Sequence, residues 1–257
     1  MTLALTHARL LTGRSLRTLS RQPAYLLFTL VQPMVWLLLF GQLFRRIAEL
    51  PGFGGNYLDY LTPGVVIMTA MMSAGWSGTS IVQDMERGVM DRTLTSPIRR
   101  SALVTAGLTH QALITVVQSL IMFAAGLVAG ARYPGGAPGL LVMLACAVLI
   151  ATIFAGLSNA IALLVHQQEA LIAVAQFLVL PLAFLSSIMI APALMPDWVA
   201  SVARYNPVDW AAVASREALT ANPDRGLVLS RVGLLTALAL LMAWLAARAY
   251  RAHQRSL

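Results

Sequence analysis

The sequence predicts an all-α integral membrane protein with six transmembrane helices, an N-terminal interfacial helix and an outer re-entrant helical hairpin before the last span. Three observations favour this fold class. Hydrophobic residues occupy 58% of the 257 positions and charged residues only 11%, against roughly 45–50% and about 25% in soluble domains. Apolar segments of about 20 residues, the length that crosses a bilayer, recur along the chain. The charged residues gather in the stretches between these segments.

The net charge of +8 comes from arginine, because all 18 basic residues are arginine and the chain contains no lysine. These arginines flank apolar segments, so we interpret them as topology determinants and membrane-lipid partners rather than as a nucleic-acid surface. Without lysine, the phosphate-binding loop GxxxxGK[ST] cannot exist. We therefore expect no cofactor or metal in this chain, and any ATP and Mg²⁺ would be bound by a partner ATPase. The single Cys146 excludes an intrachain disulfide.

Residues 1–23 are predicted to form an interfacial helix and not a signal peptide. Their arginines are spread along the segment, and no small-residue cleavage site follows an apolar core. Arg14, Arg17 and Arg21 share one helical face while the leucines lie largely elsewhere, a pattern typical of a helix on an anionic inner leaflet. The alternative is a flexible basic tail that only sets orientation.

Six apolar segments are expected to cross the membrane, at about 24–44, 62–82, 103–130, 140–165, 170–191 and 227–247. The second is rich in small and hydroxylated residues, which favour close helix packing, so we expect it inside the bundle or against a partner subunit. Gln32-Pro33 in the first span and Pro181 in the fifth predict local irregularity, which membrane helices tolerate. The candidates for a translocation path are Ser73, Trp76, Ser77, His110, Gln118, Asn159 and Gln176.

Six spans place both termini on the same side of the membrane. Eleven arginines fall on that side and six on the other, with Arg231 near the outer end of the last span. Because Lys and Arg are retained in the cytoplasm, both termini are predicted to be cytoplasmic. The inner arginines are Arg9, Arg14, Arg17, Arg21, Arg87, Arg92, Arg99, Arg100, Arg248, Arg251 and Arg255, and the outer ones are Arg45, Arg46, Arg132, Arg204, Arg216 and Arg225.

The densest run of charge is the segment 83–101, QDMERGVMDRTLTSPIRRS, between the second and third expected spans. Asp84, Arg87 and Asp91 follow i, i+3, i+7 spacing, which predicts a short amphipathic helix. Ser96-Pro97 is typical of an N-cap followed by proline at the first helical position. We expect this loop to face the cytoplasm and to contact another protein. The alternative is a solvated loop that only sets topology.

The segment 192–226 is too long for a turn and too apolar for a free loop. Breaks at Asn206-Pro207 and Asn222-Pro223 predict two short helices, with Trp198 and Trp210 as interfacial aromatics. Such a hairpin suggests an outer gate, in which Asn206 pairs with freed backbone groups or caps the next helix. The alternative is an external cap with no gating role. The candidate gate residues are Tyr205, Asn206, Pro207 and Asp209.

Three stretches carry a resemblance to a known family: RQPAYLLFTLVQPMVWLLLFGQLF, QDMERGVMDRTLTSPIRRSAL and RYNPVDWAAVASREAL. Together they resemble the ABC-2 type permeases, and among these the daunorubicin-resistance-like permease subunits of bacterial ABC exporters. The resemblance covers nearly the whole chain, and the charged loop is its most specific part. Asp91 stands where the family often has glutamate, which is a conservative departure.

The resemblance implies that the charged loop is a coupling helix, which docks on a separate ATP-hydrolysing subunit. It also implies a second permease chain, as homodimer or heterodimer, with the first and fifth spans at the seam, in the bacterial inner membrane. The chain itself would then be no enzyme. Spans rich in Leu, Ala, Val and Met suit an amphiphilic or lipid-like cargo, such as a drug, a glycolipid or a lipid-linked polymer. The implied coupling residues are Asp84, Glu86, Arg87, Gly88, Asp91, Arg92, Pro97 and Arg99.

Two other function classes are weighed against this one. An intramembrane enzyme would need a convergent set of catalytic groups, and the sequence contains neither HExxH nor GxSxG. An ion-coupled carrier acting without an ATPase would usually place a carboxylate inside a span. None of the six expected spans contains Asp or Glu.

Overall fold

The structure is a computed structural model that describes residues 23–44, 56–87, 100–165 and 167–253. Within these ranges the regular structure is helical throughout, which confirms the all-α prediction for this part of the chain. The N-terminal segment expected at the interface falls almost wholly outside them. The helices are α2 (Pro23–Leu43), α3 (Tyr57–Gly75), α4 (Thr79–Glu86), α6 (Arg100–Val128), α7 (Gly136–Val165), α8 (Gln168–Phe184), the 3₁₀ turn η2 (Pro192–Leu194), α9 (Asp197–Ala203), α10 (Pro207–Ala218) and α11 (Arg225–His253).

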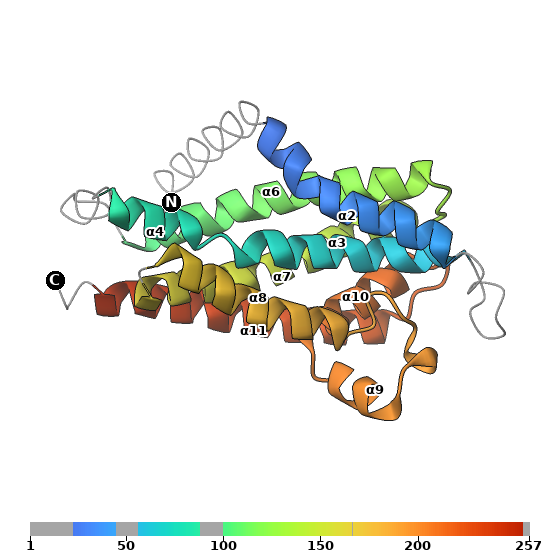
Figure 1. Ribbon diagram of the computed structural model, residues 1–257. Helices are drawn as coiled ribbons and strands as arrows, with labels where there is room; N and C mark the ends of the chain where they lie inside the picture. The colour runs from blue at the N-terminus through green and yellow to red at the C-terminus, as the bar shows by residue number, and fades with distance from the viewer. Residues whose placement is uncertain (1–22, 45–55, 88–99, 166, 254–257) are drawn as a thin grey trace, which may run out of the picture.

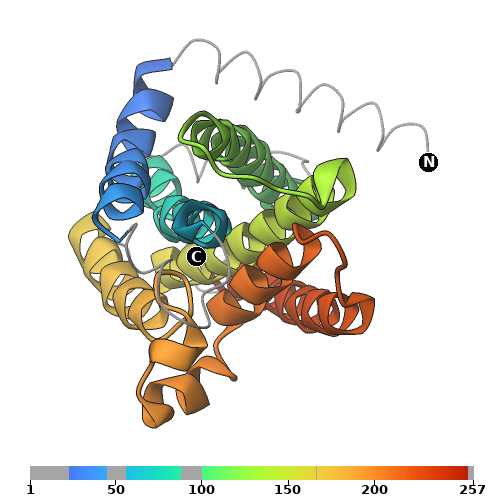
Figure 2. The same ribbon diagram turned by 90° about the vertical axis from the view of Figure 1, so that its right-hand side faces the viewer.

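The long helices run back and forth along one axis and form an elongated bundle (Figure 1). At one end, here called the α4 end, lie α4, the end of α7, the start of α8 and the last turns of α11. At the opposite end, the α10 end, lie α10, the start of α3 and the start of α11. Viewed along this axis, α3 and α7 occupy the middle of the bundle, with α2, α6, α8 and α11 around them (Figure 2).

Four helical stretches in the described residues are long and apolar enough to cross a membrane. One of them joins α3 to α4. The apolar parts of α2 and α8, Thr29–Leu43 and Gln168–Phe184, are shorter. A multi-pass membrane protein is therefore supported, and the count of six spans stays a prediction. The four stretches are Tyr57–Glu86, Gly107–Val128, Gly136–Val165 and Arg225–Arg248.

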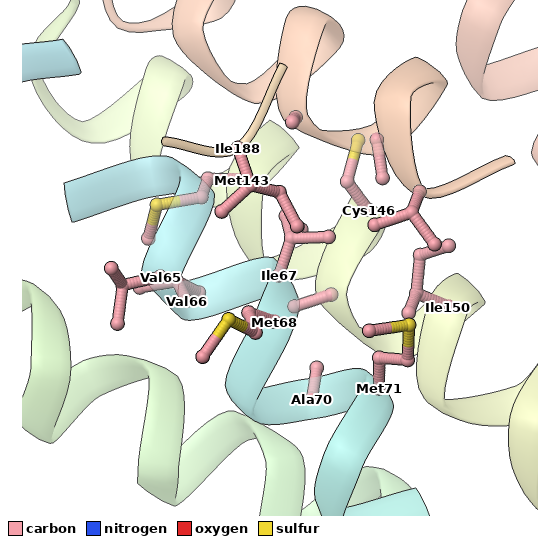
Figure 3. Packing of buried hydrophobic residues seen from close by; sticks show 14 of the residues in the cluster. Val65, Val66, Ile67, Met68, Ala70, Met71, Met143, Cys146, Ile150 and Ile188 are labelled. Atoms are coloured by element: carbon pink, nitrogen blue, oxygen red, sulfur yellow. The ribbon is translucent and has the colours of Figure 1, made fainter. Parts of the chain in front are cut away.

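Helix α3 is buried on every side, as expected for the second span. Val65, Val66 and Ile67 are consecutive and all fully buried, which is possible only when neighbours surround the helix (Figure 3). Met143 and Ile150 of α7 pack against this run in the main hydrophobic core. The centre of the bundle is thus a packed contact between α3 and α7.

Two expected spans differ from the helices observed. The second, expected at 62–82, is interrupted at residues 76–78, where α3 ends and α4 begins. The fifth, expected at 170–191, ends as a helix at Phe184, and residues 185–190 continue without helical structure. In both places side chains from neighbouring helices bind the backbone. Helical periodicity within one segment cannot predict contacts made by other segments.

The segment 192–226 contains the two short helices predicted for it, α9 and α10, with the turn η2 before them. That the pair re-enters the membrane stays a prediction. Helix α10 begins at Pro207 after the cap Asn206, so the expected break is observed. Trp198 on α9 is 64% exposed. Trp210 on α10 instead donates its indole N–H to the Arg204 carbonyl at 2.6 Å. Helix α9 projects from the side of the bundle near the α10 end (Figure 1).

Candidate functional site

Helix α4 presents mixed charge at its end of the bundle. Asp84, Glu86 and Arg87 are exposed, and Arg87 follows the last helical residue as the C-cap. The opposite face of α4 buries Ile81 and Val82. Because one face is anchored, the charged residues point away from the bundle. The remaining predicted coupling residues, Gly88, Asp91, Arg92, Pro97 and Arg99, and the predicted cap at Ser96 lie outside the described residues.

The anchored face of α4 belongs to a small hydrophobic cluster, separate from the main core. In it, Ile81 and Val82 pack against Ala162 and Leu163 of α7 and against Leu171 of α8. The short helix is thus held in place by packing against the end of α7 and the start of α8. The amphipathic helix expected from the sequence begins earlier than the charged loop, at Thr79.

The break between α3 and α4 is held by side chains of α7. The Ser158 hydroxyl donates to the Gly75 carbonyl at 2.6 Å and accepts the Gly78 backbone N–H at 3.1 Å. Next to it, the Ser77 hydroxyl donates to the Asn159 side-chain oxygen at 3.2 Å. Ser77 and Asn159, both predicted to line a path, are therefore brought together here. Ser158 was not singled out by sequence reasoning.

At the α10 end, Asn206 joins the end of α8 to the start of α10. Its side-chain oxygen accepts the Val208 N–H at 2.9 Å, which makes it the N-cap of α10. Its amide nitrogen donates to the carbonyls of Leu182 and Leu185, at 2.7 and 2.9 Å. These carbonyls lie at the end of α8, where the last C=O groups of a helix have no backbone N–H within the helix to bind. Asn206 is 3% exposed, so the predicted cap is also a buried link between two elements.

Asp209, in the first turn of α10, binds the same non-helical segment. Its carboxylate accepts the Ser187 backbone N–H at 2.8 Å. Pro207 occupies the first turn, where its missing N–H costs nothing. Tyr205 is 82% exposed and lies away from this contact. Of the four predicted gate residues, the structure therefore places Asn206 and Asp209 directly on the segment 185–190.

Arg216 completes this network from the last turn of α10. Its guanidinium donates to the Tyr60 and Ile188 carbonyls, at 2.9 and 2.7 Å, and to the Ser187 hydroxyl at 3.1 Å. Its Cζ also lies 3.6 Å from the centre of the Tyr60 ring. The Tyr60 hydroxyl in turn donates to the Ser187 carbonyl at 2.6 Å. Residues 185–190 are thus clamped between α3 and α10 by charged and aromatic groups.

Sequence reasoning missed the role of Arg216 and counted it only as an outer topology charge. The structure corrects this, because the side chain is partly buried and its guanidinium binds backbone and hydroxyl groups. Burial lowers the pKa of the Arg216 guanidinium from its usual value, and the nearby Tyr60 and Asp209 oppose that shift. The available signal was spacing: Asp209 and Arg216 are seven residues apart and so share one face of α10.

The other candidates for a translocation path do not gather in one place. Gln118 is buried and donates to the Thr29 hydroxyl of α2 at 3.1 Å. Ser73 accepts from the Gln111 amide at 3.2 Å. These are hydrogen bonds between helices of the bundle. Trp76 is 46% exposed, while His110 and Gln176 are partly buried on α6 and α8.

The first turn of α3 contains a carboxylate that the expected second span left out. Because α3 begins at Tyr57, earlier than the expected span, Asp59 falls in its first turn. Its carboxylate accepts the Arg132 backbone N–H at 2.8 Å, so it ties α3 to the turn before α7. Within the described ranges, His, Cys, Asp and Glu form no group of three placed to hold a metal ion.

Residues 6–220 match the sequence model of the ABC-2 type transporter membrane family. The chain is 30% identical to the daunorubicin resistance ABC transporter permease protein DrrB1 of Streptomyces coeruleorubidus, over 84% of this chain and 77% of the relative. It is also 28% identical to the putative transport permease ycf38 of Porphyra purpurea, over 74% of this chain and 66% of the relative, and to that of Cyanophora paradoxa, over 75% and 67%. The chain therefore belongs to the ABC-2 type transporter family, as a multi-pass membrane component of an ABC transporter.

Proposed function

We propose that this permease works as the membrane-spanning subunit of an exporter, which moves an amphiphilic or lipid-like substrate out of the cytoplasm. The energy would come from hydrolysis of ATP, which is bound together with Mg²⁺ by a separate ABC ATPase subunit, the partner that the family implies. A single observation carries the proposal: α4 presents exposed charges of both signs on a short helix anchored to the ends of α7 and α8. Mixed charge favours orientation and specificity at a protein interface.

The proposed topology has six crossings, formed by α2, α3 with α4, α6, α7, α8 and α11. Both termini and the α4 end would face the cytoplasm of a bacterial cell, with the protein in its inner membrane. The arginine distribution supports this orientation. The alternating direction of these helices supports the number of crossings (Figure 1).

The functional unit would contain two permease chains and two ATPase subunits, with α2 and α8 at the seam between the permeases. Large apolar side chains are exposed on both helices, and Val35 and Phe177 are 52% and 77% exposed. Lipid or a second permease chain would cover them. Of the residues named as path candidates, Trp76 and the partly buried Gln176 keep surface that would face the space between the two chains, whereas Gln118 and Asn159 are buried in hydrogen bonds within one bundle.

We propose that the segment of α9 and α10 forms an outer gate. The links from Asn206 and Asp209 to residues 185–190 would hold two short helices at a fixed angle above the path. In this role the segment controls release of substrate rather than use of ATP. A plain external cap without gating function is the competing interpretation.

For the substrate, the name of the Streptomyces relative offers a first class. That relative is named for daunorubicin resistance. An amphiphilic drug agrees with spans built of Leu, Ala, Val and Met, and export of such a compound would give antibiotic resistance. Glycolipids and lipid-linked polymers share the same amphiphilic chemistry.

An ion-coupled carrier is less well supported. Such a carrier would use a carboxylate near the middle of a span. Asp59 lies in the first turn of α3, at one end of the bundle, and its carboxylate already binds a backbone N–H. The ATPase-dependent function gives the exposed charges on α4 a docking role, whereas in a carrier they would only be hydrated.

The proposal is tested by reversing charge on α4. In the double variant Asp84→Lys and Glu86→Lys, we expect insertion into the membrane to be unchanged, because both residues are exposed. Copurification of the ATPase subunit and stimulation of its ATP hydrolysis should both be lost. Asp197→Lys, an exposed charge reversal on α9 at the other end, is the control for a change of surface charge and should leave copurification and hydrolysis unchanged. Unchanged copurification and hydrolysis in the double variant would refute docking through α4.

A further inference from the structure

The joint between α3 and α4 lies where the two hydrophobic clusters of the protein meet. On α7, Ala155 belongs to the main core, whereas Ala162 belongs to the small cluster that holds α4. Ser158 and Asn159 lie between them, 3% and 6% exposed. They contact the backbone or side chains of residues 75–78. The change from one cluster to the other thus coincides with the break in the helix.

Ser158 supplies the hydrogen bonds that a continuous helix would have made. In an α-helix the Gly78 N–H would bind the Ala74 carbonyl, and the Thr79 N–H would bind the Gly75 carbonyl. Here the Ala74 carbonyl accepts from Ser77, and the Trp76 carbonyl accepts from Thr79, both at 3.1 Å. The Gly78 N–H and the Gly75 carbonyl are therefore left without their helical partners, and the single Ser158 hydroxyl binds both. The break is therefore stabilised by a defined partner.

Gly78 lets α7 approach this closely. A Cβ atom at this position would lie 2.6 Å from the Ser158 carbonyl oxygen and 2.8 Å from its hydroxyl oxygen, closer than real Cβ contacts. Any other residue would push α4 away from α7. The position of α4 therefore depends on two residues far apart in sequence, a glycine on one side and a serine on the other.

We propose that Ser158 is a positioning residue for coupling, which sets the direction of α4 relative to α3. Asn159 and Gly78 assist it, the first through Ser77 and the second by allowing the close approach. Through this joint, α4 moves together with the facing ends of α7 and α8 when the ATPase subunits close. The inference rests on the proposed function, because it assigns the joint a role in passing motion from the ATPase to the membrane helices.

The test compares hydroxyl deletions in the full permease–ATPase complex. Ser158→Ala removes both hydrogen bonds, and Ser77→Ala removes only the contact with Asn159. Ser215→Ala is the matched control, because Ser215 is also fully buried but lies on α10, away from the joint. Two quantities are measured: ATP hydrolysis per copurified ATPase subunit, and hydrogen exchange of the α4 backbone amides.

Ser158→Ala should raise α4 exchange by about 5- to 150-fold, the range that the loss of two ordinary hydrogen bonds supplies, and should lower stimulated hydrolysis by at least about threefold. Ser77→Ala should act in the same direction with a smaller effect, and Ser215→Ala should change neither quantity. If Ser158→Ala prevents assembly of the complex, ATP hydrolysis and α4 exchange in the Ser77→Ala complex decide whether the joint takes part in coupling.

Hydrolysis per ATPase subunit that is unchanged in Ser158→Ala, or in Ser77→Ala where only that complex assembles, would overturn the proposal. Ser158 and Asn159 would then serve stability alone. A wild-type permease that does not stimulate its ATPase at all would overturn the proposed function instead. The two failures are thus distinguishable in one experiment.

Discussion

Replacing Asn206 by alanine tests whether the segment of α9 and α10 acts as a gate. The substitution removes three hydrogen bonds from a side chain that is 3% exposed. One caps α10, and a lost N-cap typically costs about 1 kcal/mol. The other two satisfy carbonyls of Leu182 and Leu185, and each ordinary hydrogen bond contributes about 0.5–1.5 kcal/mol net. The link between α8 and α10 should therefore weaken by about 2–4 kcal/mol.

A loss of this size should be visible as local opening. At about 1.4 kcal/mol per factor of ten, 2–4 kcal/mol corresponds to roughly 30- to 700-fold faster hydrogen exchange in the first turns of α10. If the segment gates release, transport should fall while ATP hydrolysis by the complex continues. Adding Pro207→Ala, which frees the chain at the first helical position, should increase both effects.

Asn222→Ala is the matched control for this prediction. Asn222 also precedes a proline, but it is exposed and forms none of these hydrogen bonds. It should leave exchange, transport and hydrolysis unchanged. Both rates are to be measured on the same reconstituted sample of each variant. The gate is refuted if transport and hydrolysis fall together in Asn206→Ala, or if neither changes. Unchanged exchange would refute the energetic reasoning.

Two further predictions concern the outer network and the seam. Arg216→Gln should lower the free energy of unfolding by at least about 3 kcal/mol, because three hydrogen bonds from a charged donor are lost; a thermal unfolding midpoint equal to that of the wild type would contradict this. On a Cys146→Ala background, Val35→Cys and Phe177→Cys should crosslink between protomers. Crosslinks formed only from Leu141→Cys, 66% exposed on α7, would place the seam elsewhere.

Local sequence patterns predicted the features that depend on local chemistry. The cap at Asn206 followed from an asparagine before a proline, and the acidic residue at Asp209 followed from its place in the first turn. The interior position of α3 followed from its small and hydroxylated residues. The exposed charges of α4 followed from their density in the chain, although the bounds of the helix differed.

The features that could not be predicted from the sequence depend on contacts between distant segments. The early end of α8 at Phe184 depends on Tyr60 and Arg216, which bind residues 185–190 from two other helices. The break after Gly75 depends on Ser158, more than eighty residues away. Serine is a common residue in membrane helices, so the position of Ser158 gave no signal. For Arg216, the spacing from Asp209 placed both residues on one face of α10, but it could not show that this face contacts residues 185–190.

The central claim is that ATP hydrolysed by a partner subunit drives transport through this permease, and vesicle transport tests it most directly. Inside-out vesicles with the wild-type permease and its ATPase are given a fluorescent amphiphile such as daunorubicin, the compound in the name of the Streptomyces relative. A panel of lipid-like probes is tested alongside it. The account predicts accumulation that requires ATP, persists when ion gradients are dissipated and is lost in the Asp84→Lys and Glu86→Lys variant. Accumulation driven by an ion gradient without ATP would contradict it and establish the carrier instead.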